Sequence, residues 1–158
     1  MDGDTRGGDD TLQGSGGYET LNGDALILDD NARGGNDLLL GAGGDGGEYV
    51  GDGELRGDAR GGDDVIRTGN AGTSGLNATA SGDGAMSDSA RGGNDEVYGG
   101  TGDDYLLGDG DFGGTNLGGA GVRAGNDRLD GGAGDDTLVG DFRVPGEVAE
   151  YGRDTGSW

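Results

Sequence analysis

The sequence predicts an all-β fold, a right-handed parallel solenoid of the β-roll or β-helix kind with about five coils. A phrase of the form Arg-Gly-Gly-Asx-Asp recurs along the chain, and the 44 glycines among the 158 residues keep phase with it. Hydrophobic residues make up only 29% of the chain, which is too few for an ordinary globular core. Units that stack on one another can bury a thin core with so few apolar residues.

The recurring phrase divides the chain into units of 27 to 32 residues. It is altered to Arg-Ala-Gly-Asn-Asp in the last unit. We assign residues 1–141 to a repeat domain, and residues 142–158 to a tail or cap because Pro145 cannot continue a central strand ladder. The units start near Arg6, Arg33, Arg60, Arg91 and Arg123.

A shorter period of nine residues lies inside the units. The segments 99–107 and 131–139 both read Gly-Gly-x-Gly-x-Asp-x-U-x, where U is an apolar residue. Elsewhere the second acid is less regular, with Glu19 nine residues after Asp10, Glu48 eleven after Asp37, and Ser74 as a gap. Alternation around each acid predicts a very short strand with one side chain facing inward. The predicted inward residues are Leu12, Leu21, Leu39, Val50, Ile66, Leu76, Val97, Leu106, Leu129 and Leu138.

The charge pattern restricts the chemistry. Asp and Glu number 32 against 10 basic residues, and the chain has no His and no Cys. A net charge of −22 argues against nucleic acid as a partner, and no apolar run is long enough for membrane insertion. Imidazole, thiol and Ser-His-Asp chemistry are excluded, so carboxylates and carbonyls remain, and these are ligands for calcium. The acids repeat along the whole chain and single out no catalytic pair, so we expect no enzyme.

The two full nonapeptides and the five phased half-matches resemble the RTX (hemolysin-type) calcium-binding repeat. The resemblance covers roughly residues 2–141. It implies several Ca²⁺ ions between successive turns, liganded by the sixth-place acid and by backbone carbonyls. The implied acids are Asp10, Asp37, Asp64, Asp95 and Asp127 on one side, and Glu19, Glu48, Asp104 and Asp136 on the other. The implied carbonyl and turn positions are Arg6, Gly8, Arg33, Gly35, Arg60, Gly62, Arg91, Gly93, Gly125, Gly99, Gly100, Thr101, Gly102, Gly131, Gly132, Ala133 and Gly134.

The chain departs from the plain repeat in its long segments, each of which opens with Gly-Asp. We interpret each unit as one coil with one tight turn and one enlarged turn; three nonapeptides per unit would suit 27 residues but not 31 or 32. The aspartates that open the enlarged turns are further candidate ligands. They are Asp24, Asp52, Asp83, Asp109 and Asp141.

Two functions are consistent with these features. The first is a calcium-dependent folding and spacer module of an extracellular adhesin or exoenzyme, which the resemblance links to type I secretion, although no convincing signal for it is seen. The second is a structural subunit that stacks end to end with copies of itself into a fibre or surface layer. The recurring arginines are expected to offset nearby carboxylates; an anion-binding ridge is the alternative.

Overall fold

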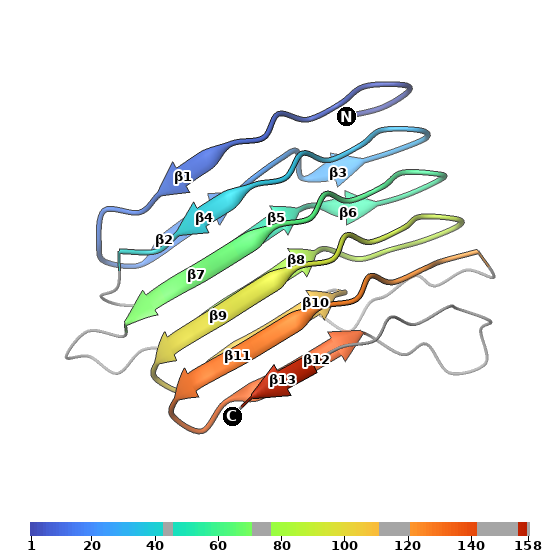
Figure 1. Cartoon of the computed structure of the whole chain (residues 1–158). Coiled ribbons are helices and arrows are strands. Elements are labelled where there is room, and N and C mark those ends of the chain that lie inside the picture. The colour runs from blue at the N-terminus through green and yellow to red at the C-terminus, as the bar shows by residue number, and fades with distance from the viewer. Residues whose placement is uncertain (43–45, 71–76, 111–120, 142–154, 158) are drawn as a thin grey trace.

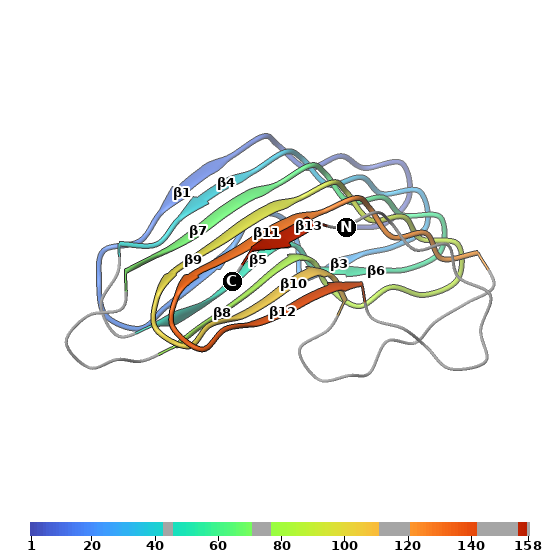
Figure 2. The ribbon, with the colours of Figure 1, turned by 60° about the horizontal axis from the view of Figure 1, so that its bottom comes forward.

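The computed structural model describes residues 1–42, 46–70, 77–110, 121–141 and 155–157. These residues form two parallel sheets that stack face to face in a flattened coil (Figures 1 and 2). The first sheet has the order β1-β4-β7-β9-β11-β13. Its strands are β1 (Thr11–Gln13), β4 (Leu38–Leu40), β7 (Val65–Asn70), β9 (Glu96–Thr101), β11 (Arg128–Ala133) and β13 (Thr155–Ser157).

The second sheet has the order β12-β10-β8-β5-β2, and the chain alternates between the two sheets. Its strands are β2 (Glu19–Asn22), β5 (Gly47–Asp52), β8 (Ala78–Asp83), β10 (Tyr105–Asp109) and β12 (Thr137–Asp141). Every pairing is parallel, so the all-β parallel solenoid predicted from the sequence is confirmed. Five stacked strand pairs make about four full turns, slightly fewer than the five coils expected.

The main core lies between the two sheets, and each sheet contributes a single layer of side chains to it. Leu39, Ile66, Val97 and Leu129 stack in register along the first sheet and are buried. This thin stack explains how a chain with so few apolar residues folds. Leu12, Leu21 and Leu138, near the ends of the stack, are only partly buried.

The sequence prediction was wrong at Val50. The register pairs Leu21 with Tyr49 and not with Val50, and Tyr49 is the buried side chain. In the next unit the inward residue predicted at Leu76 lies outside the described residues, and Ala78 and Ala80 contribute to the core there. Tyr49 is large enough to fill the space beside these small alanines, and its hydroxyl lies 3.3 Å from both Oε1 of Glu19 and the carbonyl oxygen of Thr68.

The enlarged turns have a small core of their own. Strands β3 (Ile27–Leu28) and β6 (Glu54–Leu55) pair there, and a further bridge joins Leu55 to Met86. Leu28, Leu55 and Met86 are buried, together with a small residue from each turn. The small residues are Ala32, Ala59 and Ala90. The enlarged turns are therefore a second stacked layer.

Part of the predicted tail adds to the solenoid. Strand β13 pairs in parallel with β11 through Arg128–Thr155, Leu129–Gly156 and Asp130–Ser157. The other predictions for the tail concern residues 142–154 and 158, which lie outside the described residues. No helix in the described part of the chain is long and apolar enough to cross a membrane.

Candidate metal centre

Nine aspartates form a continuous file where the second sheet meets the enlarged turns. They make four groups of three, and in each group the carboxylate oxygens lie within 4.8 Å of one another. The groups are Asp24-Asp37-Asp52, Asp52-Asp64-Asp83, Asp83-Asp95-Asp109 and Asp109-Asp127-Asp141. Consecutive groups share an aspartate, so Asp52, Asp83 and Asp109 each belong to two.

Two different sequence positions supply these side chains. The shared aspartates end strands β5, β8 and β10 of the second sheet, where the Gly-Asp pairs open the enlarged turns. The remaining interior acids are the sixth-place residues that immediately precede β4, β7, β9 and β11 of the first sheet. The sequence predicted both sets as ligands, and the structure brings them together in the same groups. Asp10, the sixth-place acid of the first unit, is exposed and lies outside the groups found among the described residues.

Each sixth-place carboxylate is held by the preceding coil through one oxygen. Oδ1 of Asp37 accepts a 2.7 Å hydrogen bond from the amide of Asp10, and Oδ1 of Asp64 accepts one of 2.7 Å from the amide of Asp37. The pattern continues at 2.8 Å from the amide of Asp64 to Oδ1 of Asp95. These bonds fix the carboxylates in one orientation along the file.

The shared aspartates are held in the opposite direction. Oδ2 of Asp52 accepts a 2.6 Å hydrogen bond from the amide of Gly62, and Oδ2 of Asp83 accepts one of 2.6 Å from the amide of Gly93. Both glycines lie one coil further along the chain. Each shared carboxylate therefore bridges the second sheet of one coil to the first sheet of the next.

The other oxygen of each interior carboxylate is buried and accepts no hydrogen bond. Within the described residues these orphaned atoms include Oδ2 of the sixth-place acids and Oδ1 of the shared acids. The side chains are at most 2% exposed. The atoms are Asp37 Oδ2, Asp52 Oδ1, Asp64 Oδ2, Asp83 Oδ1 and Asp95 Oδ2. Because a buried, unsatisfied carboxylate oxygen is costly, a file of them fits a bound cation.

Burial raises the pKa of every interior carboxylate for which a shift is resolved. The pKa of Asp37 rises from 3.8 to about 6, and that of Asp52 and of Asp64 to about 8. The pKa values of Asp83 and Asp95 are raised well above 3.8. Loss of hydration is the largest cause, and repulsion between neighbouring carboxylates adds to it. The file is therefore unstable when its carboxylates are charged, and bound cations would stabilise it.

Glycine is required beside the file because nothing larger fits. A Cβ atom on Gly51 would lie 1.9 Å from Oδ2 of Asp64, and one on Gly34 would lie 1.9 Å from Oδ2 of Asp52. The glycines of the recurring Gly-Asp and Arg-Gly pairs thus lie directly against the carboxylates, which occupy the space that a larger side chain would need.

The tight turns at the other end of the sheets hold a smaller set of acids. Strand register places Glu19, Gly47, Ala78, Asp104 and Asp136 in one column. Oδ1 of Asp104 accepts a 2.8 Å hydrogen bond from the amide of Ala78, and the pKa of Asp104 is raised by burial and by Asp136. Oδ2 of Asp104 and of Asp136 are buried and accept no hydrogen bond. The segments 99–102 and 131–134 form these turns, where the sequence predicted carbonyl ligands.

Three predictions for the tight turns differ from the structure or lie outside the described residues. Glu48 pairs with Thr20 and Thr79, so Gly47 and not Glu48 takes the acid's place in the column. Glu19 is in the column, but its carboxylate accepts hydrogen bonds from the amides of Ser15 and Ala42 at 2.8 and 2.9 Å. Ser74, predicted as a gap, lies outside the described residues.

The arginine carbonyls predicted as ligands have a structural role. Those of Arg33, Arg60 and Arg91 accept hydrogen bonds of 2.8 Å from the glycine amides of the preceding coil. The arginine side chains were expected to offset nearby carboxylates, but these three make no direct ion pair among the described residues. Arg6 lies 3.9 Å from Asp9, and both side chains are well exposed.

One protein family matches the chain. Four copies of the RTX calcium-binding nonapeptide repeat match within residues 4–25, 89–113 and 123–142. No curated protein and no solved structure matches the chain at a significant level. The matched segments contain Asp24, Asp95, Asp109, Asp127 and Asp141 of the file, as well as Asp104 and Asp136 of the tight turns. The chain therefore contains RTX calcium-binding repeats and folds as a parallel β-roll.

Proposed function

We propose that the aspartate file binds a row of calcium ions and that this binding drives the chain to fold. The observation that carries the proposal is the set of buried carboxylate oxygens that accept no hydrogen bond, on aspartates that gather in groups of three with one oxygen of each within 4.8 Å of the others. Calcium accepts six to eight oxygen ligands in flexible geometry, and carboxylates and backbone carbonyls are its usual protein ligands. Bound calcium would supply the positive charge that the file lacks.

The charge balance supports one divalent ion in each group. The file contains nine aspartates, and four divalent ions would supply eight positive charges. A trivalent ion in every group would leave an excess of positive charge, and monovalent ions would leave most of the repulsion in place. Four ions of charge two are the set that nearly neutralises the file.

Asp104 and Asp136 of the tight turns are a second, weaker candidate site. They contribute two carboxylates, whereas each group of the file contributes three. The rest of this column holds Gly47 and Ala78, which provide no charge. We therefore expect ions at the tight turns only between the last two coils, and with lower affinity.

The proposed biological role is that of a calcium-dependent structural module of a secreted protein and not of an enzyme. Extracellular calcium is abundant, so a chain that folds on binding it would be extended before export and compact afterwards. End-to-end stacking into a fibre is the second candidate, because the sheets end at edge strands β1 and β2. At the other end β13 and β12 are the last strands of the two sheets among the described residues.

Circular dichroism with and without calcium tests the main proposal. In excess chelator the chain should give a disordered spectrum, and calcium in the millimolar range should convert it to a sheet spectrum. Isothermal titration should then show about four ions of higher affinity. A sheet spectrum that persists unchanged in chelator would refute calcium-driven folding. Sedimentation in calcium separates the two roles, because only a fibre subunit should form long particles.

A further inference from the structure

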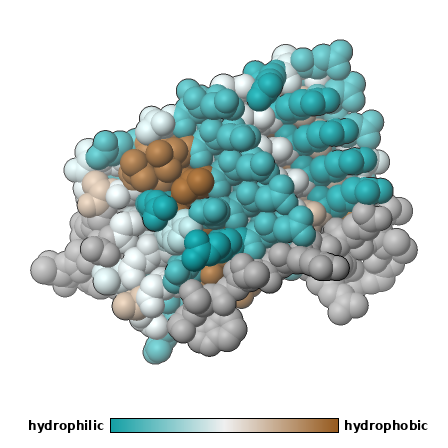
Figure 3. All heavy atoms as spheres, viewed as in Figure 1, coloured by the Kyte–Doolittle hydropathy of each residue, from teal (hydrophilic) through white to brown (hydrophobic). Residues whose placement is uncertain are grey.

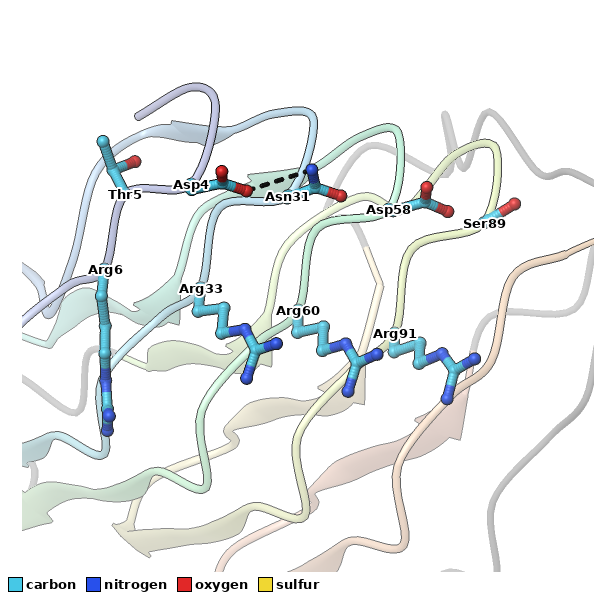
Figure 4. Close-up of a pocket in the computed structure, with 9 residues that line it drawn as sticks. All are labelled: Asp4, Thr5, Arg6, Asn31, Arg33, Asp58, Arg60, Ser89 and Arg91. Carbon is cyan, nitrogen blue, oxygen red and sulfur yellow. Dashed lines mark hydrogen bonds between the residues drawn. The ribbon is translucent and has the colours of Figure 1, made fainter.

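A column of arginines runs along the first sheet's side of the solenoid, outside the aspartate file. Backbone bridges connect Arg6 to Arg33, Arg33 to Arg60 and Arg60 to Arg91. All four side chains are exposed. The guanidinium groups of Arg33, Arg60 and Arg91 project in parallel, one per coil (Figure 4), at the strand spacing of about 4.8 Å. Seen from the direction of Figure 1, the surface of the molecule shows hydrophilic side chains in parallel rows (Figure 3).

These three guanidinium groups are unusual in a chain of net charge −22. Within the described residues, Arg33, Arg60 and Arg91 form neither an ion pair nor a side-chain hydrogen bond. Other arginines are engaged: Arg56 lies 2.6 Å from Glu54, and Arg67 stacks on the ring of Tyr98 at 4.3 Å. Like charges held side by side without a direct ion pair repel one another, so a stacked row of them suits an external anion.

The arginines form one wall of a groove. The groove has a volume of about 560 Å³ and crosses several coils. Its other wall comes from the enlarged turns and carries Asp4, Asn31, Asp58 and Ser89 in successive coils. The amide of Asn31 donates a 3.2 Å hydrogen bond to Asp4 (Figure 4). One wall is therefore cationic, and the facing wall is rich in hydrogen-bond acceptors and donors.

We propose that this groove binds an acidic polysaccharide laid across the coils. A glycan with a carboxylate on each ring would place its carboxylates against the guanidinium row, which can bind them through paired hydrogen bonds. Its hydroxyl groups would face the carboxylate, amide and hydroxyl side chains of the other wall, which exchange hydrogen bonds with hydroxyls. Head-to-tail sugar rings repeat at a step comparable to that between coils, so several contacts would form at once.

The second wall distinguishes a glycan from other polyanions. An acidic peptide or a nucleic acid would have to bring anionic groups close to Asp4 and Asp58, and neither polymer offers a continuous edge of hydroxyls to them. The strongly negative field of the whole chain also disfavours a densely charged polymer. A glycan with carboxylates along one edge and hydroxyls along the other avoids the first penalty, because its charges face the guanidinium row and not Asp4 and Asp58.

The groove exists only in the folded coil, so the inference rests on calcium-driven folding, and the test separates the two. Circular dichroism first establishes that the chain folds in calcium. Binding of a short oligogalacturonate to the folded chain is then measured by isothermal titration at fixed calcium concentration. Folding without binding overturns the groove proposal alone, whereas failure to fold overturns the proposed function.

Two triple variants with equal net charge make the test specific. The groove variant replaces three arginines of the column by glutamine, and the control variant replaces three arginines that lie outside the column. The groove variant is Arg33→Gln, Arg60→Gln and Arg91→Gln; the control is Arg56→Gln, Arg67→Gln and Arg128→Gln. The groove variant should bind the glycan about tenfold more weakly, and the control should bind it as the natural chain does.

Further probes identify the chemistry. The methyl-esterified glycan, which has no carboxylate charge, should bind far more weakly, and added salt should weaken binding of the charged form. Equal weakening by both triple variants would mean that the net charge of the chain, and not the arginine column, controls binding, and would overturn the proposal. Binding of polyglutamate as tight as that of the glycan would overturn the assignment to a polysaccharide.

Discussion

Oδ1 of Asp64 accepts a 2.7 Å hydrogen bond from the amide of Asp37, the equivalent residue of the preceding coil. The other oxygen of the same carboxylate lies in the group that Asp64 forms with Asp52 and Asp83, where it accepts no hydrogen bond. One side chain therefore joins two coils with one oxygen and offers the other to a cation. Stacking of the coils and assembly of the site are the same event.

Substitution of a file aspartate should have opposite effects with and without calcium. Asp64→Asn keeps an oxygen for the amide of Asp37 but removes one buried charge from the file. The calcium concentration at which half of the chain is folded should rise on the order of tenfold, because a charged ligand is lost. In chelator the variant should be no less stable than the natural chain, because repulsion falls.

Asp63→Asn is the matched control for this variant. Asp63 is exposed and belongs to a ladder in which the neighbouring coils carry Asn36 and Asn94. Asp63→Asn removes one negative charge, as Asp64→Asn does, at the adjacent position. An asparagine fits there because the ladder already contains asparagines in the neighbouring coils. Calcium-titrated circular dichroism should show an almost unchanged midpoint. Equal shifts for the two variants would mean that net charge, and not the file, controls folding.

Shared and unshared aspartates should differ in how many ions they affect. Asp83 belongs to two groups, and Asp95 belongs to one. Asp83→Asn should therefore weaken two ions, and Asp95→Asn should weaken one. Isothermal titration with calcium measures this as a loss of about two against about one ion of higher affinity. An equal loss for both variants would show that the ions do not share ligands.

Low pH should stabilise the calcium-free fold, because protons neutralise some of the carboxylates that calcium would otherwise neutralise. In the folded chain the pKa of Asp37 is about 6 and those of Asp52 and Asp64 are about 8, above the ordinary value of 3.8. The calcium-free fold then binds more protons than the unfolded chain between about pH 4 and 8, so its stability is highest at low pH and falls as pH rises through this range.

Calcium affinity should change with pH in the opposite direction, because calcium displaces these protons. We expect the calcium midpoint to fall as pH rises from 5 to 8. Titration in buffers of different ionisation enthalpy should detect protons released on binding at pH 6 to 7. A midpoint that does not depend on pH over this range would show that the carboxylates are already charged in the calcium-free fold.

Close stacking of the coils should make one glycine position irreplaceable in all coils but the first. A Cβ atom on Gly62 would lie 1.7 Å from the carbonyl oxygen of Gly35, a backbone atom that cannot move away alone. Gly62→Ala should cost at least about 2 kcal/mol in the free energy of unfolding in calcium.

Gly8 takes the same place in the first coil, and its nearest contact would be 3.3 Å from Oδ2 of Asp10. Gly8→Ala should change stability by no more than about 0.5 kcal/mol. Chemical denaturation at saturating calcium measures both variants. Similar losses for the two would show that the close approach between coils is not what requires glycine.

The sequence predicted the strands well because its signal is local. Around Ile66 and Val97 the phased glycines, the acid and the apolar residue all agree, and both side chains are buried as expected. The prediction failed at Val50 because Tyr49 and Val50 are both apolar and the register of this unit is shifted by one residue, so that Gly47 and not Glu48 pairs with Glu19. Glu48 follows Asp37 at a distance of eleven positions instead of nine, and this was the one available warning.

The groups of three could not be derived from the sequence. Asp52 and Asp64 were both candidate ligands, but they lie on different sheets and at opposite ends of an enlarged turn. Their meeting depends on the path of that turn, which is set by the burial of Leu55 and Ala59 in its own core. A spacing between two acids along the chain does not by itself show that their side chains meet in space.

The second apolar core has a kinetic consequence. The aspartate file runs between the core of the two sheets and that of the enlarged turns, and Asp52, Asp64, Asp83 and Asp95 are at most 1% exposed. An ion bound among them has no path to solvent while the coils stay stacked. Its residence time would then be set by how often a neighbouring coil detaches, and exchange would proceed inward from the two ends of the file.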